Sequence, residues 1–179
     1  DTIDGGGGSQ TIFGMDGDDL IIGGRDLLAS RDINNTIPVA SLPDKTESDD
    51  AADALYGGRG NDTIMGGAGN DTLDGGDGDD VLRGQAGADV FRGGAGSDTV
   101  DYSMESPFQL LVNLELNIAS GGTGSGDTFF GIENLIGSDD RIDRFIDTSA
   151  DNHFWGRGGG DYFNGRDGND ILDEIGRAH

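Results

Sequence analysis

A nine-residue repeat occurs five times without interruption between residues 57 and 101, and it constrains the fold more than any other feature of the chain. The copies are 57–65, 66–74, 75–83, 84–92 and 93–101, and each follows Gly-Gly-x-Gly-x-Asp-x-U-x, where U is a large apolar residue; Gln85 is a departure from it. A disordered linker has no reason to keep glycine, aspartate and an apolar residue in one strict phase. The pattern therefore indicates a parallel β-roll.

The residue types within one copy define its local structure. Glycines at the first, second and fourth positions allow a tight turn that visits positive φ without a steric cost. The last three residues suit a very short strand whose middle side chain points inward, because side chains alternate along a strand. The inward residues would be Ile64, Leu73, Leu82, Phe91 and Val100.

One copy then forms half a coil, and copies two apart stack as parallel neighbours about 4.8 Å apart. We therefore predict an all-β fold, a parallel β-roll (a right-handed β-solenoid) in which two repeat blocks are joined by a non-repetitive β segment.

The aspartate at the sixth position of each copy is a candidate metal ligand. In this block these residues are Asp62, Asp71, Asp80, Asp89 and Asp98. Stacking brings the carboxylates of alternate copies to roughly 5 Å, where they repel by about 1 kcal/mol in water and by more in a less polar setting. A cation between the coils would turn this repulsion into attraction. Ca²⁺ accepts about six to eight oxygen ligands in flexible geometry, whereas Mg²⁺ requires a stricter octahedron and should substitute poorly.

Backbone carbonyl groups of the glycine-rich turns would complete the calcium ligands. We expect the carbonyls of Gly57, Arg59, Gly60, Gly66, Ala68, Gly69, Gly75, Asp77, Gly78, Gly84, Ala86 and Gly87 to take part. Counting stacked pairs predicts about six to eight Ca²⁺ ions. Asp80 would face both Asp62 and Asp98, and Asp98 would end the stack, so sites that share aspartates should fill cooperatively.

The same pattern flanks the uninterrupted block on both sides. Upstream copies are 5–13 and 14–22, downstream copies are 156–164 and 165–173, and a degenerate copy covers 147–155. The further side-chain ligands that we expect are Asp19, Asp53, Asn152, Asp161 and Asp170. Gln10 replaces the aspartate of the first copy, so a site there should be weak or empty.

These copies resemble the RTX (repeats-in-toxin, hemolysin-type) family of secreted calcium-binding proteins, and the resemblance covers roughly half of the chain. Intervening stretches such as Asp101-Tyr102-Ser103 and Gly131-Ile132-Glu133-Asn134-Leu135 are similar to those that join RTX repeat blocks. The resemblance implies calcium-dependent folding, a secreted or cell-surface location and export by type I secretion. Because the chain opens in mid-pattern at Asp1-Thr2-Ile3-Asp4, we expect it to be a segment of a larger protein.

The repeat phase divides the chain into six parts. N-terminal repeats occupy 1–24, an insertion loop 25–52, the main repeat block 53–101, a β linker 102–137, a C-terminal repeat block 138–173 and a tail 174–179. We interpret the insertion as a surface loop that leaves the roll, because loops accept insertions at low cost. Binding of a partner by this loop is the alternative.

Two apolar patterns lie outside the regular copies. In the linker, the period of two predicts a strand through Leu110, Val112, Leu114, Leu116 and Ile118. Towards the C-terminus, the register places Phe154 and Phe163 in the core and Trp155 and Tyr162 on the outside. We interpret these aromatic residues as a cap on the roll, and a sugar-binding platform is the alternative.

Charge and composition limit the partners. The chain has 35 acidic residues against 11 Lys and Arg, and a formal net charge of -24. This charge would keep the metal-free chain expanded, and it argues against nucleic acid as a partner. There is no cysteine, so calcium rather than disulfides would staple an extracellular chain. No apolar stretch approaches the roughly 18 residues of a membrane span.

No catalytic motif occurs in the chain. His153 and His179 are its only histidines, which excludes a His-Glu-x-x-His zinc motif, and there is no Gly-x-Ser-x-Gly elbow. We therefore expect no enzyme here, and any catalysis would belong to another part of the parent protein.

The favoured function is a module that folds on binding Ca²⁺ outside the cell and stabilises or presents neighbouring domains. One alternative is an adhesin or surface-layer building block with a glycan or a surface as partner. The other is the non-catalytic repeat region of an RTX enzyme or toxin.

Overall fold

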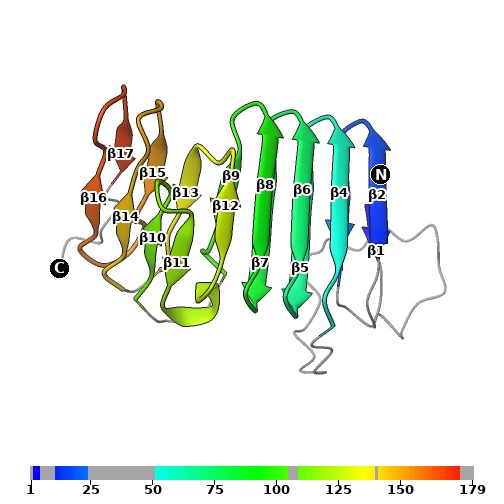
Figure 1. Ribbon diagram of the computed structural model, residues 1–179, viewed down its shortest axis with the longest axis horizontal. Helices are drawn as coiled ribbons and strands as arrows, with labels where there is room; N and C mark the ends of the chain where they lie inside the picture. The colour runs from blue at the N-terminus through cyan, green and yellow to red at the C-terminus, as the bar shows by residue number, and fades with distance from the viewer. Residues whose placement is uncertain (1, 5–10, 24–50, 105–108, 140, 174–179) are drawn as a thin grey trace.

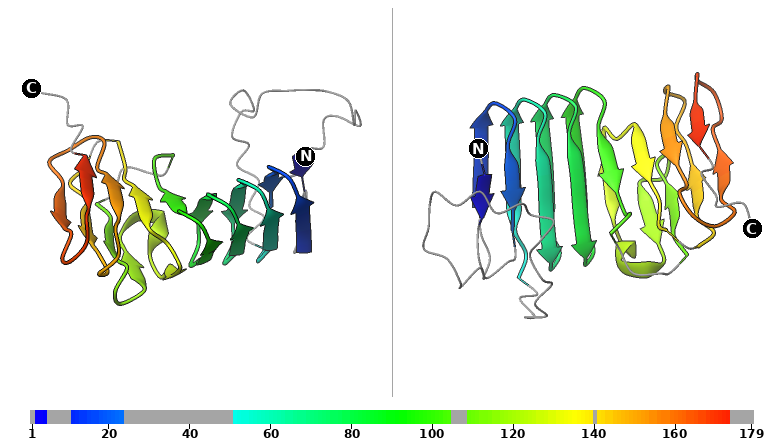
Figure 2. Two further views of the ribbon diagram at one scale, coloured as in Figure 1. Left: turned by 90° about the horizontal axis from the view of Figure 1, so that it is seen from above. Right: turned by 180° about the vertical axis from the view of Figure 1, so that it is seen from behind.

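The computed structural model describes residues 2–4, 11–23, 51–104, 109–139 and 141–173. The tail predicted at 174–179 and nearly all of the insertion predicted at 25–52 lie outside these residues. The described chain winds into a roll that advances along its long axis from β1 and β2 at one end to β16 and β17 at the other (Figure 1). Figure 2 shows the same progression from above and from behind.

Short strands form three sheets along the roll. The first sheet contains, in spatial order, β1 (Thr2–Asp4), β3 (Leu20–Ile22), β5 (Thr63–Ala68), β7 (Val81–Ala86), β9 (Thr99–Asp101), β13 (Asn134–Ile136), β15 (His153–Trp155) and β17 (Ile171–Asp173). The second contains β12 (Thr128–Phe130), β8 (Val90–Ala95), β6 (Thr72–Asp77), β4 (Ala54–Arg59) and β2 (Thr11–Asp16). The third contains β11 (Ile118–Ser120), β10 (Leu111–Asn113), β14 (Arg144–Ile146) and β16 (Tyr162–Asn164).

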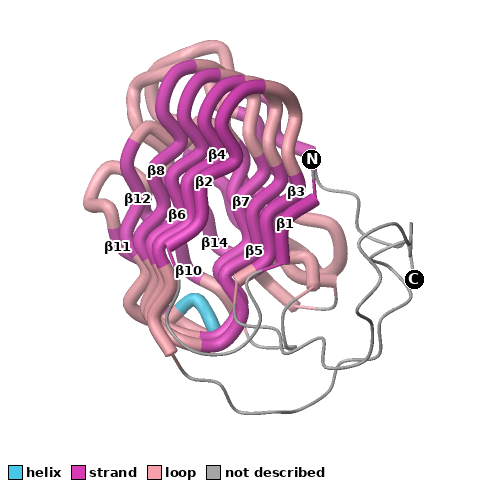
Figure 3. Tube along the Cα trace, turned by 90° about the vertical axis from the view of Figure 1, so that its right-hand side faces the viewer, coloured by secondary structure: helices cyan, strands magenta, loops and turns pink. Residues whose placement is uncertain are grey.

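Neighbouring strands are parallel, as a roll of repeats requires, and β10 with β11 is the antiparallel exception among the described strands. Viewed along the roll, the first and second sheets form two stacked rows joined by turns (Figure 3). A 3₁₀ turn, η2 (Gly122–Gly124), follows β11. No helix in the described part of the chain is long and apolar enough to cross a membrane.

The register confirms that copies two apart stack on each other. Ile64 pairs with Leu82 in the first sheet, and Leu73 pairs with Phe91 in the second. The coils on either side of the predicted insertion follow the same rule, because Ile21 pairs with Ile64. The inserted residues therefore do not change the phase of the roll.

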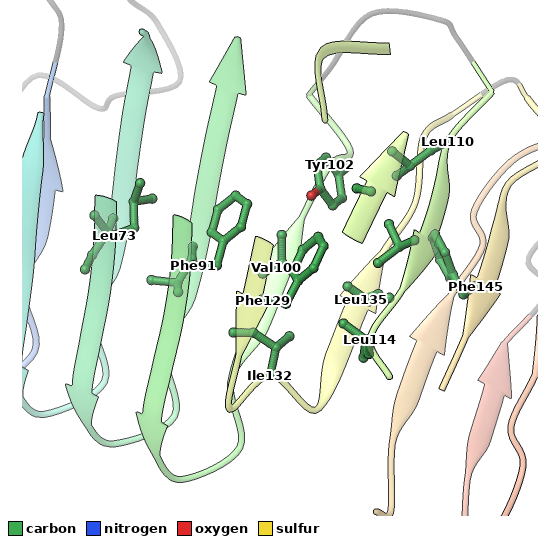
Figure 4. Close-up of a cluster of buried hydrophobic side chains, with 14 of the residues drawn as sticks. Leu73, Phe91, Val100, Tyr102, Leu110, Leu114, Phe129, Ile132, Leu135 and Phe145 are labelled. Carbon is green, nitrogen blue, oxygen red and sulfur yellow. The ribbon is translucent and has the colours of Figure 1, made fainter. Parts of the chain in front are cut away.

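The apolar position of the repeat forms the core. Ile21, Leu55, Ile64, Leu73, Leu82, Phe91, Val100, Leu135, Phe145 and Phe154 are each 0% exposed. In the close-up of Figure 4, Phe91 and Phe129 lie beside each other between the two strand rows, and their rings stack with centroids 5.6 Å apart. These side chains are buried because every coil places its inward residue directly over that of the coil before.

The prediction that one continuous strand runs through Leu110 to Ile118 is wrong. The strand β10 ends at Asn113, whose side-chain Oδ1 accepts a hydrogen bond from the Leu116 N–H at 3.0 Å. Asn117 then adopts a φ of 54°, and the chain returns antiparallel as β11. Leu116 and Ile118 are consequently 61% and 47% exposed, and the core takes Leu110, Val112 and Leu114 instead.

The C-terminal aromatic residues follow the predicted register. Phe154 is fully buried and Phe163 packs against the core. On the outer face, Trp155 stacks on His153 with ring centroids 3.5 Å apart, and Tyr162 is 58% exposed beneath the Arg144 guanidinium. The inward and outward positions of these residues thus alternate as the strands β15 and β16 require.

Candidate metal-binding sites

The sixth-position aspartates form continuous rows along the roll. From Asp62 and Asp71 onwards, each aspartate of these rows uses Oδ1 to accept a hydrogen bond from the backbone N–H of the sixth-position residue one coil earlier. The Asp62 N–H donates to Asp80 at 2.8 Å and the Asp80 N–H donates to Asp98 at 3.0 Å. We call the row beside the first sheet the first aspartate row (Asp19, Asp62, Asp80, Asp98, with Glu133 following) and the row beside the second sheet the second aspartate row (Asp53, Asp71, Asp89, Asp127).

The other carboxylate oxygen, Oδ2, points into a buried space without a protein donor. Within the described chain this is the case for Asp62, Asp71, Asp80, Asp89 and Asp98, whose exposed fractions are all 0–1%. A buried carboxylate oxygen that lacks a partner costs substantial free energy. Five such oxygens in one repeating position therefore point to a ligand that supplies positive charge.

Burial changes the acidity of these groups in the absence of a cation. Desolvation is the main cause that raises the pKa of Asp80 and of Asp98 to about 6, and of Asp89 to about 7. The backbone N–H bonded to each carboxylate lowers the pKa, but by less than burial raises it, and the neighbouring carboxylates of the row raise it further. The rows thus hold carboxylates that are poorly stabilised as anions by the protein alone.

First-position glycines leave the space that faces these oxygens. A β-carbon built on Gly75 would overlap Asp80 Oδ2 and lie 2.7 Å from the carbonyl oxygen of Gly93, which belongs to the next coil. Gly66 has the same surroundings, with Asp71 Oδ2 and the Gly84 carbonyl. The absence of a side chain here lets a carboxylate oxygen and a carbonyl oxygen from two coils converge.

The donor chemistry fits a hard cation. Among the residues that the structure describes, no three His, Cys, Asp or Glu side chains lie close enough to hold a metal by themselves. The oxygens beside the aspartate Oδ2 atoms are backbone carbonyls, such as that of Gly93 beside Asp80, and an all-oxygen set of carboxylates and carbonyls is the set that Ca²⁺ prefers.

Apart from Ala68 and Gly87, the predicted carbonyl ligands fall into three groups according to their position in the repeat. First-position carbonyls, namely those of Gly57, Gly66, Gly75 and Gly84, lie beside the first-position glycine of the preceding coil and hence beside its aspartate Oδ2. Third-position carbonyls of Arg59, Asp77 and Ala86 each accept a ladder hydrogen bond, for example from the Gly60 N–H to Asp77 at 2.8 Å. Fourth-position carbonyls of Gly60, Gly69 and Gly78 lie against the matching glycine of the next coil. Calcium ligation by these carbonyls stays a prediction.

Asp127, the last residue of the second aspartate row, has a protein donor for its Oδ2. Asp127 Oδ1 accepts from the Asp89 N–H at 2.7 Å, but its Oδ2 accepts from the Tyr102 hydroxyl at 2.8 Å. Asp143, which directly precedes β14 of the third sheet, is similar, because its Oδ2 accepts from the N–H and hydroxyl of Ser138 at 2.7 and 2.9 Å. At these two carboxylates the protein supplies the hydrogen-bond donor that the Oδ2 atoms of the five aspartates named above lack within the described chain.

Sequence reasoning missed Asp127, Glu133 and Asp143, which occupy the sixth position in the irregular coils. Asp127 and Asp143 lie two residues before a buried aromatic, as in Asp-Thr-Phe129 and Asp-Arg-Phe145, so an Asp-x-apolar search would have found them. The expectation that Asp98 ends the stack is wrong, since the Asp98 N–H donates to Glu133 Oε2 at 3.0 Å. β13 continues the first sheet beyond β9 and carries the row forward.

The remaining candidates lie in the C-terminal coils. The Asp143 N–H donates to Asp161 Oδ1 at 2.9 Å, and the Asn152 N–H donates to Asp170 Oδ1 at 3.1 Å. Asp161 and Asn152 are buried, at 7% and 3% exposure. The structure therefore brings these residues into the same stacking relation as the main block.

Comparison with known proteins agrees with this geometry. The family profile described as the RTX calcium-binding nonapeptide repeat matches the chain in four copies, at residues 1–26, 47–82, 74–103 and 135–172. A search of curated proteins found no match.

Proposed function

Since the chain belongs to the RTX calcium-binding nonapeptide repeat family, we propose that it is the calcium-binding β-roll module of a secreted protein, which folds on binding Ca²⁺ outside the cell and stabilises or presents neighbouring domains. About six to eight ions would bind between its coils. The observation that carries the proposal is the five buried Oδ2 atoms that accept no hydrogen bond within the described chain, those of Asp62, Asp71, Asp80, Asp89 and Asp98.

The proposed coupling between binding and folding follows from where the ligand oxygens come from. Asp80 Oδ2 and the Gly93 carbonyl face the same space beside Gly75 from consecutive coils of the roll. They converge only after β8 has paired with β6, so the unfolded chain lacks the site. When bound, Ca²⁺ supplies the positive charge that offsets the repulsion and the desolvation of these carboxylates.

The size of the effect is given by linkage. A site that exists only in the folded state adds RT ln(1 + [Ca²⁺]/Kd) to stability, which is about 1.4 kcal/mol when calcium is at ten times Kd. Affinities of about 0.1–1 mM are common outside cells, and millimolar calcium meets this condition at the tighter end of that range. Several sites together would supply a stabilisation comparable to the total stability of a small domain, about 5–15 kcal/mol.

The chain's own charge opposes folding when calcium is scarce. A net charge of -24 favours an expanded chain, and stacked carboxylates with raised pKa values add to the cost of folding at neutral pH. A chain with these properties would stay unfolded at cytosolic calcium levels and fold after export.

The test is far-UV circular dichroism of the chain during a calcium titration, with a parallel titration of magnesium. We expect a cooperative transition from coil to β structure near millimolar calcium and none at the same concentration of magnesium. A chain that is already folded in chelator, or that responds equally to both ions, would contradict the proposal.

A further inference from the structure

The degenerate copy at 147–155 departs from the repeat pattern at two linked positions. Asp147 occupies the first position, where the regular copies have glycine, and Asn152 occupies the sixth, where they have aspartate. The backbone confirms the equivalence: the Asp147 N–H donates to the Asn164 carbonyl at 3.0 Å, as the Gly156 N–H donates to the Asp173 carbonyl at 3.0 Å. The carboxylate of this coil has thus moved from the sixth position to the first.

The side chains at both positions are buried and keep an oxygen without a partner. Asp147 is 0% and Asn152 is 3% exposed. Asn152 Nδ2 donates to the Glu133 carbonyl at 2.7 Å, and among the described residues its Oδ1 accepts no hydrogen bond. Asp147 Oδ1 accepts a hydrogen bond from the Thr148 N–H at 2.5 Å, and its Oδ2 has no donor within the described residues. The Asn152 amide lacks the negative charge of a sixth-position carboxylate, and Asp147 restores that charge to the coil.

A second carboxylate faces this pair from the next coil. Asp170 Oδ1 accepts from the Asn152 N–H at 3.1 Å. Asp170 also lies within interaction range of the Asp147 carboxyl, whose pKa burial raises to about 7, with a further increase from Asp170. The carboxylate of the half-buried Asp170 therefore lies next to the buried pair of Asp147 and Asn152.

In a regular copy the first-position α-carbon lies against the sixth-position Oδ2 of the same copy. A β-carbon built on Gly156, for example, would overlap Asp161 Oδ2. The two positions thus border one space, and a carboxylate can enter it from either side. Aspartate at both positions would place two like charges in one buried space, and the uncharged Asn152 avoids that repulsion.

We propose that Asp147, Asn152 and Asp170 form a Ca²⁺ site in which the first-position Asp147, rather than a sixth-position aspartate, supplies the carboxylate. The inference rests on the proposed function, since it assigns to this coil the ligand that the regular coils bind. It predicts that a coil lacking the sixth-position aspartate still holds an ion.

The experiment counts bound calcium per folded chain by equilibrium dialysis at saturating calcium, with circular dichroism on each sample. Asp147→Asn keeps the shape and removes the charge, and Asp147→Gly removes the side chain. The double variant Asp147→Gly with Asn152→Asp restores the regular pattern. Asp167→Asn, at an exposed residue, makes the same change in net charge as Asp147→Asn and is the matched control.

We expect Asp147→Asn and Asp147→Gly to bind one ion fewer than the natural chain, and the double variant and Asp167→Asn to bind the same number. An unchanged count in Asp147→Asn would overturn the inference and identify the pair as two carboxyls that share a proton. If both single variants fail to fold, the double variant decides the question. If it binds one ion more than the natural chain does, the natural coil has no site and the inference is overturned. A natural chain that binds no calcium would instead refute the proposed function.

Discussion

Replacement of Gly75 by alanine tests whether the space beside the aspartate rows is a cation site. Gly75 lies outside the positive-φ region, so alanine adds no backbone strain there. The added β-carbon would overlap Asp80 Oδ2 and approach the Gly93 carbonyl oxygen to 2.7 Å. The carbonyl is part of the backbone of the next coil and cannot rotate away, so the new methyl group fills the space in which the two oxygens converge.

The magnitude has three contributions. Loss of one site removes about 1.4 kcal/mol at ten times Kd, and overpacking costs about 1–3 kcal/mol. Alanine also lowers the conformational entropy of the unfolded chain, which stabilises the folded state by about 0.4–1 kcal/mol. We therefore expect Gly75→Ala to lower the free energy of unfolding by about 1.5–4 kcal/mol and to raise the calcium midpoint of folding.

Gly160→Ala is the matched control, because a β-carbon there would meet nothing within 4 Å and Gly160 also has no positive φ. It should be neutral or stabilise by up to about 1 kcal/mol. Both variants are measured by urea unfolding at fixed calcium, followed by circular dichroism, and by calcium titration. Equal stabilities and equal calcium midpoints for the two variants would refute the reasoning, because the space beside Asp80 would then hold no ligand.

Three further perturbations address the core, the rows and their ends. Leu82→Asp should prevent folding at any calcium concentration, because Leu82 is 0% exposed and an unpaired charge there is very costly; a β-rich circular dichroism spectrum of this variant would disprove the inward register. In chelator, β structure should increase as pH falls. The pKa of the row aspartates rises from 3.8 to about 6–7 on folding, so their stabilising protonation is complete below pH about 4 and lost above about 7; a metal-free chain equally unfolded from pH 8 to pH 4 would contradict this. Tyr102→Phe leaves Asp127 Oδ2 without its donor and should cost about 1–3 kcal/mol in urea unfolding, whereas an unchanged midpoint would show that the bond is unimportant.

Much of the roll could be predicted from the sequence because the repeat is short and its parts act locally. Glycines at fixed positions allow the turns, and an apolar residue two positions after the aspartate points inward. Leu82 and Phe91 are fully buried as this rule requires, and Asp80 stacks between Asp62 and Asp98. Where the pattern is degenerate but the Asp-x-apolar spacing remains, as at Asp143 and Phe145, the structure still places both residues in register.

The linker could not be predicted in the same way, because its apolar spacing fits more than one path of the chain. The turn after β10 depends on the Asn113 side chain and on the positive φ of Asn117. The parallel partner of β10 is β14, which lies about thirty residues further along the chain. A period of two predicts which residues lie on each face of a strand, but it does not predict where the strand ends.

The sequence by itself determined the length of a coil, its inner and outer faces and the spacing of its carboxylates, since each follows from residues within nine positions of one another. Only the tertiary structure decided where the rows of donor-free oxygens end. Asp127 accepts a hydrogen bond from the hydroxyl of Tyr102, which lies 25 residues away in the sequence. Asp147 faces the carboxylate of Asp170 in the next coil. Whether a buried carboxylate needs a cation depends on which donors reach it from other coils, and that is set by how the coils stack.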